Sequence, residues 1–73
     1  MNRKDIKASY SKRLRNLRKK YGYTQQKLAE LAEVEYKHIQ RLESKRPCDI
    51  KLSTMEKIAK AFDISLSELL DFK

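Results

Sequence analysis

Hydrophobic residues recur at helical spacing from one end of the chain to the other. In the N-terminal part they lie three or four residues apart, as on one face of an α-helix, at Ile6, Tyr10, Leu14, Leu17 and Tyr21. The only glycine of the chain, Gly22, follows directly, and glycine readily closes a helix in the left-handed conformation. No segment alternates apolar and polar residues as a half-buried strand does. The pattern therefore predicts an all-α fold with a first helix over residues 5–21.

Two short helices are expected next, separated by a tight turn. Thr24 is a favourable N-cap, and the apolar positions after it predict a second helix over residues 25–32. The apolar pattern is interrupted around Glu33, where we expect the turn, and resumes in a third helix over residues 36–44. Pro47 breaks this stretch, because the residue before a proline avoids helical backbone angles.

The C-terminal third predicts two more helices, over residues 52–61 and 66–71. The fourth helix has two alternative starts: a capping box at residues 53–56, or Lys51 as the cap. The fifth begins at a clearer capping box, formed by Ser65 and the glutamate three residues later. We expect these five helices to form one compact domain over residues 1–73, with residues 1–4 as a candidate flexible arm.

Composition excludes several ways of holding so small a chain together. The 73 residues include one cysteine, Cys48, and one histidine, His38. A single cysteine cannot form an intrachain disulfide, and one cysteine with one histidine cannot supply three or four zinc ligands. No run of apolar residues is longer than two, which excludes a membrane span. We therefore expect a cytoplasmic protein without metal or cofactor, and pairing of two chains would help to stabilise its modest core.

Positive charge is concentrated in the first third of the chain. Residues 1–23 contain nine of the 18 Lys and Arg and one acid, whereas residues 24–73 contain nine bases and nine acids. A basic pole of this kind favours a polyanion, either nucleic acid or an anionic membrane surface. A solvated basic face without a partner is the plainer alternative.

Residues 24–43 have the pattern typical of a helix-turn-helix. Its two short helices are joined by a tight turn, with Leu28, Val34 and Ile39 facing inward and the small Ala29 at the crossing. Such a unit can place its second helix in the major groove of DNA.

A larger set of spaced residues points to one family. The set comprises Leu17, Arg18, Gly22, Thr24, Gln25, Leu28, Ala29, Glu30, Val34, Ile39, Leu42, Glu43, Pro47, Met55, Ile58, Ala59, Ala61, Phe62 and residues 66–69. Through them, the chain resembles the Cro and phage-repressor family of helix-turn-helix regulators over about residues 13–70. The resemblance implies a sequence-specific regulator of transcription, in the first place a repressor that binds double-stranded DNA as a homodimer.

The third helix would present side chains that suit base edges. With its two apolar residues facing inward, steps of about 100° per residue place Lys37, Gln40 and Arg41 on the far side and Tyr36 on a flank. Lysine can donate to guanine, glutamine can pair with adenine, and a tyrosine ring can contact a thymine methyl group. Arg41 could reach a base or a phosphate. The alternative is that all four are ordinary exposed residues.

The resemblance also implies contacts to DNA phosphates. In the family, the glutamine at the start of the second helix binds a phosphate with help from the helix N-terminus, and here that residue is Gln25. The loop after the recognition helix contacts the backbone, which selects Lys45 and Arg46. His38 occupies a position that the family often fills near a phosphate, although partly buried packing is the alternative for a lone histidine.

Further positions carry a structural implication. In the family, an arginine and a glutamate that match Arg18 and Glu43 form an ion pair between the first helix and the end of the recognition helix.

Two glutamates depart from the family pattern. Glu33 stands where the family commonly has glycine in the turn, and Glu35 stands where it has a serine or threonine cap. Because glutamate in the left-handed conformation costs about 1 kcal/mol, we expect a wider turn or a longer second helix. The two carboxylates would tune specificity or simply complement a helix N-terminus.

The first and last helices complete the expectations. The bases of the first helix, Arg13 and Arg15 among them, would act at a distance and raise the association rate with DNA. The last helix is more apolar than its length requires, so part of it is a candidate dimer surface; its apolar residues are Leu66, Leu69, Leu70 and Phe72.

Three other functions compete with the repressor hypothesis. One is an antitoxin or immunity-type component with a protein partner and autoregulatory DNA binding. Another is a membrane-surface peptide that uses the basic first helix. An enzyme is the least supported, because the sequence offers no carboxylate pair, nucleophile and base set or metal-ligand cluster.

Overall fold

The computed structural model describes residues 6–71, and in that range it contains five α-helices and no strand. The helices are α1 (Ile6–Lys20), α2 (Gln25–Ala32), α3 (Tyr36–Leu42), α4 (Leu52–Ala61) and α5 (Leu66–Leu69). The all-α prediction is confirmed, and each helix begins and ends within two residues of the predicted bounds. The candidate arm at residues 1–4 and Phe72 lie outside the described residues.

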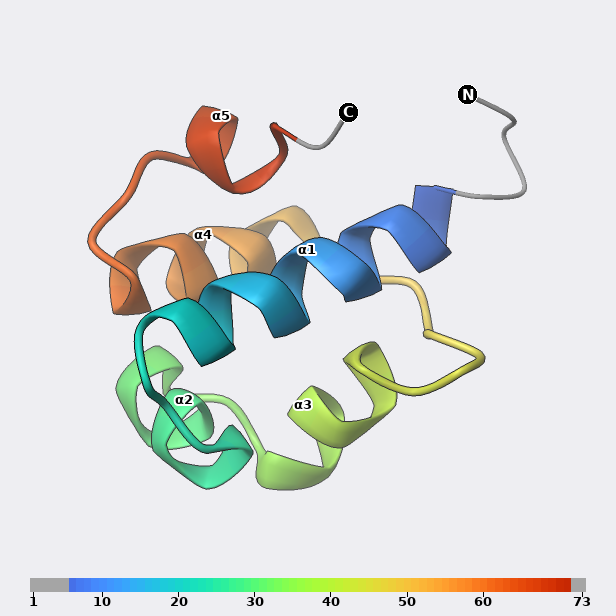
Figure 1. The fold of residues 1–73 in the computed structure, drawn as a ribbon, viewed down its shortest axis with the longest axis horizontal. Helices are drawn as coiled ribbons and strands as arrows, with labels where there is room; N and C mark the ends of the chain where they lie inside the picture. Colours follow the sequence, from blue (N-terminus) through green and yellow to red (C-terminus); the bar gives the residue numbers. More distant parts are fainter. Residues whose placement is uncertain (1–5, 72–73) are drawn as a thin grey trace.

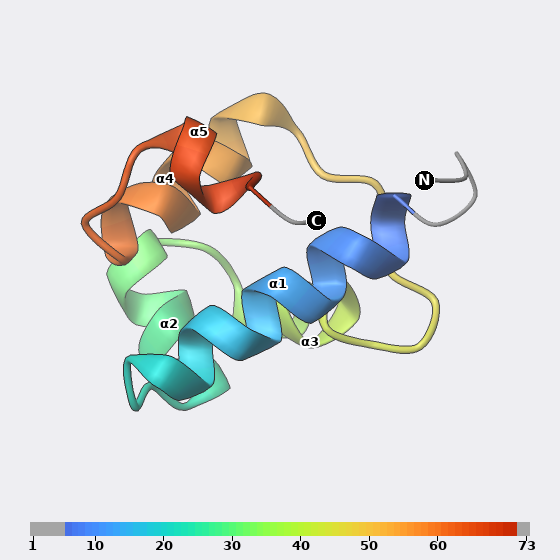
Figure 2. The same cartoon turned by 45° about the horizontal axis from the view of Figure 1, so that its top comes forward.

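Helix α1 crosses the middle of the molecule, with the other helices gathered around it (Figure 1). In that view α2 and α3 lie below α1, α4 lies behind it and α5 lies above it. Helix α2 packs on both α3 and α4, and α5 packs on α4. The tilted view in Figure 2 shows α5 beside α4. The pair of helices α2 and α3 is therefore held together by its own packing and is fixed to α4 through α2.

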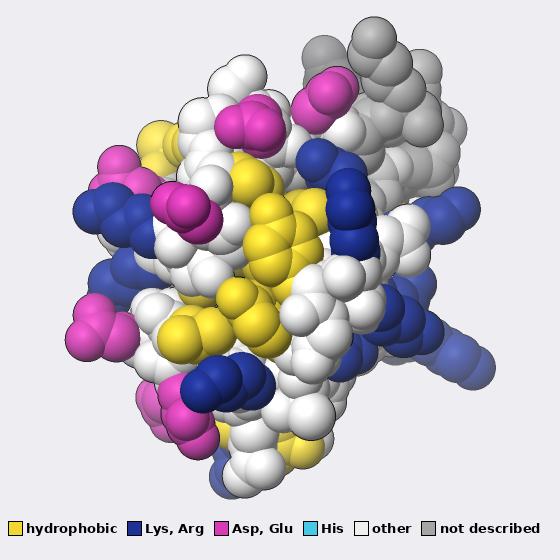
Figure 3. Space-filling model, turned by 60° about the vertical axis from the view of Figure 1, so that its left-hand side comes forward, with side chains coloured by type: hydrophobic (Ala, Val, Ile, Leu, Met, Phe, Trp, Pro, Cys, Tyr) yellow, Lys and Arg dark blue, Asp and Glu magenta, His cyan; other side chains and the backbone are white. Residues whose placement is uncertain are grey.

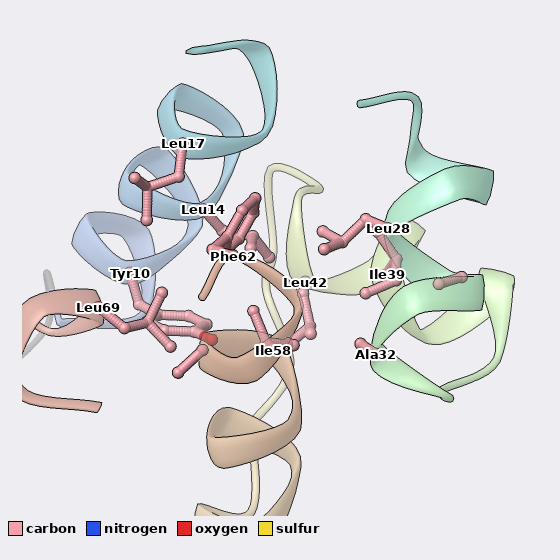
Figure 4. Packing of buried hydrophobic residues seen from close by; sticks show 12 residues of the cluster. Tyr10, Leu14, Leu17, Leu28, Ala32, Ile39, Leu42, Ile58, Phe62 and Leu69 are labelled. Carbon is pink, nitrogen blue, oxygen red and sulfur yellow. The ribbon is translucent and has the colours of Figure 1, made fainter. Parts of the chain in front are cut away.

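The core draws on all five helices (Figure 4). Its fully buried large side chains are Leu14, Leu28, Ile39, Leu42, Ile58, Phe62 and Leu69. Of the first apolar stripe, Ile6 is 56% exposed and lies outside this core, whereas Tyr21, although 39% exposed, places its ring 5.0 Å from that of Phe62. At the crossing of α2 and α3, Ala29 is buried, in agreement with the need for a small residue there.

The turn between α2 and α3 is tight, and the expectation of a wider turn or a longer helix was wrong. Glu33 adopts the left-handed conformation with φ 57°. The next amide, of Val34, donates to the Ala29 carbonyl at 3.0 Å, and Val34 packs against the core. This closing hydrogen bond and apolar contact are typical of a helix C-terminus with a left-handed residue, and they offset the strain on Glu33.

The turn between α4 and α5 repeats this arrangement. Asp63 has φ 57°, and the following amide, of Ile64, donates to the Ala59 carbonyl at 3.0 Å. Ile64 packs against the core as Val34 does. Two of the helix ends are thus closed by an acidic residue followed by a β-branched apolar residue.

The helix starts of α2, α4 and α5 fall at predicted capping residues, and for α4 the structure selects one of the two predicted starts. Thr24 accepts a hydrogen bond from the Lys27 amide at 3.0 Å, and Ser65 and Glu68 form the predicted capping box. Helix α4 begins after Lys51, so the alternative capping box at residues 53–56 is not formed. Lys51 makes no side-chain capping bond.

One side of the surface carries mixed charges around exposed hydrophobic residues. On the side at the left of Figure 1, where α2 lies, Lys and Arg side chains and acidic side chains surround exposed hydrophobic ones (Figure 3). This mixture agrees with the equal numbers of bases and acids in residues 24–73. Within residues 6–71, no helix is long and apolar enough to cross a membrane, and no group of three or more metal-ligating side chains comes together.

Candidate nucleic-acid interface

Helix α3 has one buried face and one face open to solvent. Ile39 and Leu42 are fully buried and fix the helix against the core. The side chains that were predicted to read bases are all exposed: Tyr36, Lys37, Gln40 and Arg41. A seven-residue helix is too short to be stable by itself, so its orientation depends on the buried pair.

A groove with a cavity volume of about 430 Å³ lies beside this open face. The groove is lined by residues of α3 and its N-cap and by two residues of the following loop. The first group is Glu35, Lys37, His38 and Arg41, and the second is Cys48 and Asp49. His38 is half-buried and forms part of the groove wall. Its side chain therefore remains on the same side of the molecule as Lys37 and Arg41, which also line the groove.

The loop after α3 carries two free cations. Lys45 and Arg46 are exposed, and neither forms a hydrogen bond or ion pair within the described part of the chain. Asp49, further along the loop, pairs with Lys7 of α1 at 3.0 Å, and both of these side chains are largely exposed. The loop thus offers two unpaired positive charges next to the C-terminal end of α3.

Gln25, the first residue of α2, is held by the protein itself. Its side-chain nitrogen Nε2 donates to Oε1 of Glu43 at 3.0 Å. The sequence did not suggest this contact, because the two residues are 18 positions apart and belong to different helices, Gln25 to α2 and Glu43 to the end of α3. The hydrogen bond places the N-terminal end of α2 next to the C-terminal end of α3.

Arg18 and Glu43 form a bidentate ion pair. Nε of Arg18 donates to Oε2 at 2.7 Å, and its Nη2 donates to Oε1 at 3.0 Å. The remaining terminal nitrogen, Nη1, donates to the carbonyl of Tyr23 at 2.9 Å. The side chains of Arg18 and Glu43 are 14% and 2% exposed, so the pair is mostly withdrawn from water and joins α1 to the end of α3.

Two further arginines of α1 have structural roles that the sequence analysis missed. Arg15 donates to the Glu43 carbonyl at 3.3 Å, and Arg13 donates to the carbonyls of Glu68 at 2.6 Å and Leu69 at 3.3 Å. These carbonyls lie at the C-terminal ends of α3 and α5, where cations are favoured by unpaired carbonyl groups and the helix dipole. The only signal in the sequence was the dense run of bases, which does not separate such arginines from solvated ones.

Comparison with known proteins agrees with this geometry. The model of the Cro/C1-type HTH DNA-binding domain matches residues 13–73. No curated protein matches the chain at a significant level. The family match includes α2, α3 and the loop that follows, and extends through α4 and α5. The chain therefore belongs to the Cro/C1-type helix-turn-helix family of DNA-binding domains, which are not enzymes.

Proposed function

We propose that this DNA-binding domain is a transcriptional repressor that recognises a specific duplex by placing α3 in the major groove. The observation that carries the proposal is the division of α3 into a fully buried face and an exposed face with base-reading chemistry. On the exposed face, Lys37 would donate to guanine and Gln40 would pair with adenine. Tyr36 and Arg41 would contact bases at the two ends of this surface.

Phosphate contacts on both sides of α3 would fix its register on the duplex. Lys45 and Arg46 are exposed and unpaired after the helix, and His38 lines the adjoining groove. Gln25 lies at the N-terminus of α2, where unpaired backbone N–H groups favour an anion.

We further propose that two copies bind a two-fold-related site, with half-sites about 34 Å apart. Of the candidate dimer surface, Leu69 is fully buried and Leu66 is half-buried, so both serve the fold, whereas Leu70 is 37% exposed. Leu70 lines an apolar cavity of about 460 Å³ together with Ile6, which is 56% exposed. Covering these side chains with a second copy would remove apolar surface from water.

The test begins with selection of bound duplexes from a random pool. With the selected duplex, Lys37→Ala or Gln40→Ala should cost about 1–3 kcal/mol and relax the preference at one base pair. Arg46→Ala should weaken binding to selected and random duplexes alike and lower the salt slope by about 1. Failure to enrich any sequence, or equal losses on selected and random duplexes for Lys37→Ala, would contradict base reading.

Dimer formation is tested separately by sedimentation of the protein with the selected duplex. Two copies should bind each duplex, and Leu70→Glu should reduce the cooperativity of their binding because it places a charge on the proposed contact. Ser67→Glu is a control, since Ser67 is an exposed residue of α5, which Leu70 follows, and does not line the cavity. One copy per selected duplex would contradict the dimer.

A further inference from the structure

The Glu43 carboxylate is shared by two donors from different helices. Oε1 accepts from Arg18 Nη2 and from Gln25 Nε2, each at 3.0 Å, and Oε2 accepts from Arg18 Nε at 2.7 Å. The Glu43 side chain is 2% exposed. Its negative charge is therefore offset by a bidentate guanidinium, while one hydrogen bond remains for the glutamine amide.

This arrangement determines which way round the Gln25 amide sits. A carboxylate only accepts hydrogen bonds, whereas an amide has one end that donates and one that accepts. Glu43 therefore selects the orientation in which the amide nitrogen of Gln25 faces the carboxylate. One of its two N–H groups is used in that bond, and the other has no partner within residues 6–71.

The orientation bears on phosphate binding at the start of α2. A phosphate oxygen accepts hydrogen bonds and repels an amide carbonyl, so a flipped amide would oppose the anion. The charge on Glu43 would repel a phosphate as well, but the short contacts to Arg18 compensate it. Gln25 is half-buried, so its amide remains partly accessible from solvent.

We infer that Glu43 is a positioning residue for DNA binding: it orients the Gln25 amide so that the second N–H of Nε2 is presented to a phosphate. The inference rests on the proposed phosphate contact of Gln25. Glu43 also links the two helices of the helix-turn-helix, because it lies at the end of α3 and orients Gln25 at the start of α2. A phosphate bound at α2 would thereby set the position of α3 in the groove.

The test is a double-mutant cycle on affinity for the selected duplex. Gln25→Ala should weaken binding about tenfold or more, the scale of one hydrogen bond to a charged group. Glu43→Gln keeps the shape of the side chain but can present either end of its amide, so it should weaken binding to a similar extent. If Glu43 acts through Gln25, the double variant should bind about as well as either single variant. Multiplied losses would overturn the inference.

A matched control and a stability check accompany the cycle. Gln26 is the exposed neighbour of Gln25 and makes no hydrogen bond to Glu43, so Gln26→Ala should combine with Glu43→Gln multiplicatively. Because Gln25 is neutral, Gln25→Ala should leave the salt slope unchanged, unlike Arg46→Ala. Affinities are measured at a temperature where circular dichroism shows every variant folded.

A second measurement uses the wild-type protein and does not depend on the folding of Glu43→Gln. Nuclear Overhauser contacts between the Gln25 amide protons and the Glu43 side chain should persist in the DNA complex, while one amide proton shifts on binding. Loss of these contacts on adding DNA would show that Gln25 leaves Glu43, and would overturn the inference. Either failure leaves base reading by Lys37 intact, whereas absence of any selected duplex refutes the proposed function itself.

Discussion

Replacement of Glu43 by alanine tests how far the recognition helix depends on one buried carboxylate. The substitution removes the acceptor of two hydrogen bonds from Arg18 and one from Gln25. The Arg18 guanidinium would stay in place at 14% exposure of its side chain, with the Tyr23 carbonyl as its remaining partner. The variant therefore leaves a mostly buried charge without its counterion.

The expected loss of stability follows from these contacts. Breaking a buried ion pair by removing one partner costs about 3–5 kcal/mol. The value here belongs at the lower end, about 3 kcal/mol, because Arg18 retains a carbonyl and some access to water. For a domain of this size, such a loss lowers the melting temperature by about 12–24 °C.

The assay is urea and thermal unfolding followed by circular dichroism. Asp49→Ala is the matched control, because it also removes the acid of an ion pair with α1, but one whose side chains are 51% and 88% exposed. That control should change stability by about 0.5 kcal/mol or less. Combined replacement of both partners, Arg18→Met with Glu43→Leu, should recover part of the loss, since no unpaired charge remains. If Glu43→Ala unfolds like the control, the reasoning is refuted.

Two further substitutions have outcomes that the structure determines. Glu33→Gly should stabilise the fold by about 0.5–1 kcal/mol in urea unfolding, because glycine adopts the left-handed conformation without strain; a loss of stability would show that the glutamate side chain has a favourable role. Tyr10→Phe removes a buried hydroxyl that has no hydrogen-bond partner among residues 6–71, so it should be neutral or stabilising near pH 7. Burial raises the pKa of Tyr10 above its ordinary value of 10.0, so the unfolded chain ionises first as the pH rises. The free energy of unfolding of the wild type therefore falls as the pH rises above 10, whereas that of the variant has no such contribution from position 10. The advantage of the variant should grow between about pH 9 and pH 11. An equal difference at both pH values would contradict this account.

The features that were predictable from the sequence are those set by neighbouring residues. The caps at Thr24 and Ser65 depend on hydrogen bonds within one helical turn, and both are formed as predicted. The helices follow from the spacing of apolar residues, which identifies the buried face of α3 through Ile39 and Leu42. Such local signals need no knowledge of how the helices pack.

The features that the sequence missed depend on contacts between distant segments. Glu33 and Asp63 take the left-handed conformation because the residue after each is drawn into the core. Arg13 and Arg15 belong to a run of bases whose members differ only in what lies opposite them in the fold. Gln25 was predicted as a phosphate ligand, and its hydrogen bond to Glu43 became visible only once α2 and α3 were placed together.

The basic excess of α1 therefore has two components with different consequences. Arg15 binds the carbonyl of Glu43 and Arg18 binds its carboxylate, so both guanidinium groups are fixed at the C-terminal end of α3. A positive charge is favourable there because it faces the negative end of the helix dipole. Exposed lysines such as Lys19 and Lys20 make no such contact within residues 6–71 and add only to the field around the protein. Because α3 has seven residues and cannot hold its own conformation, the two arginines stabilise the surface that the proposal assigns to base reading. Their loss should then weaken DNA binding through stability, and loss of the lysines through association rate and salt dependence.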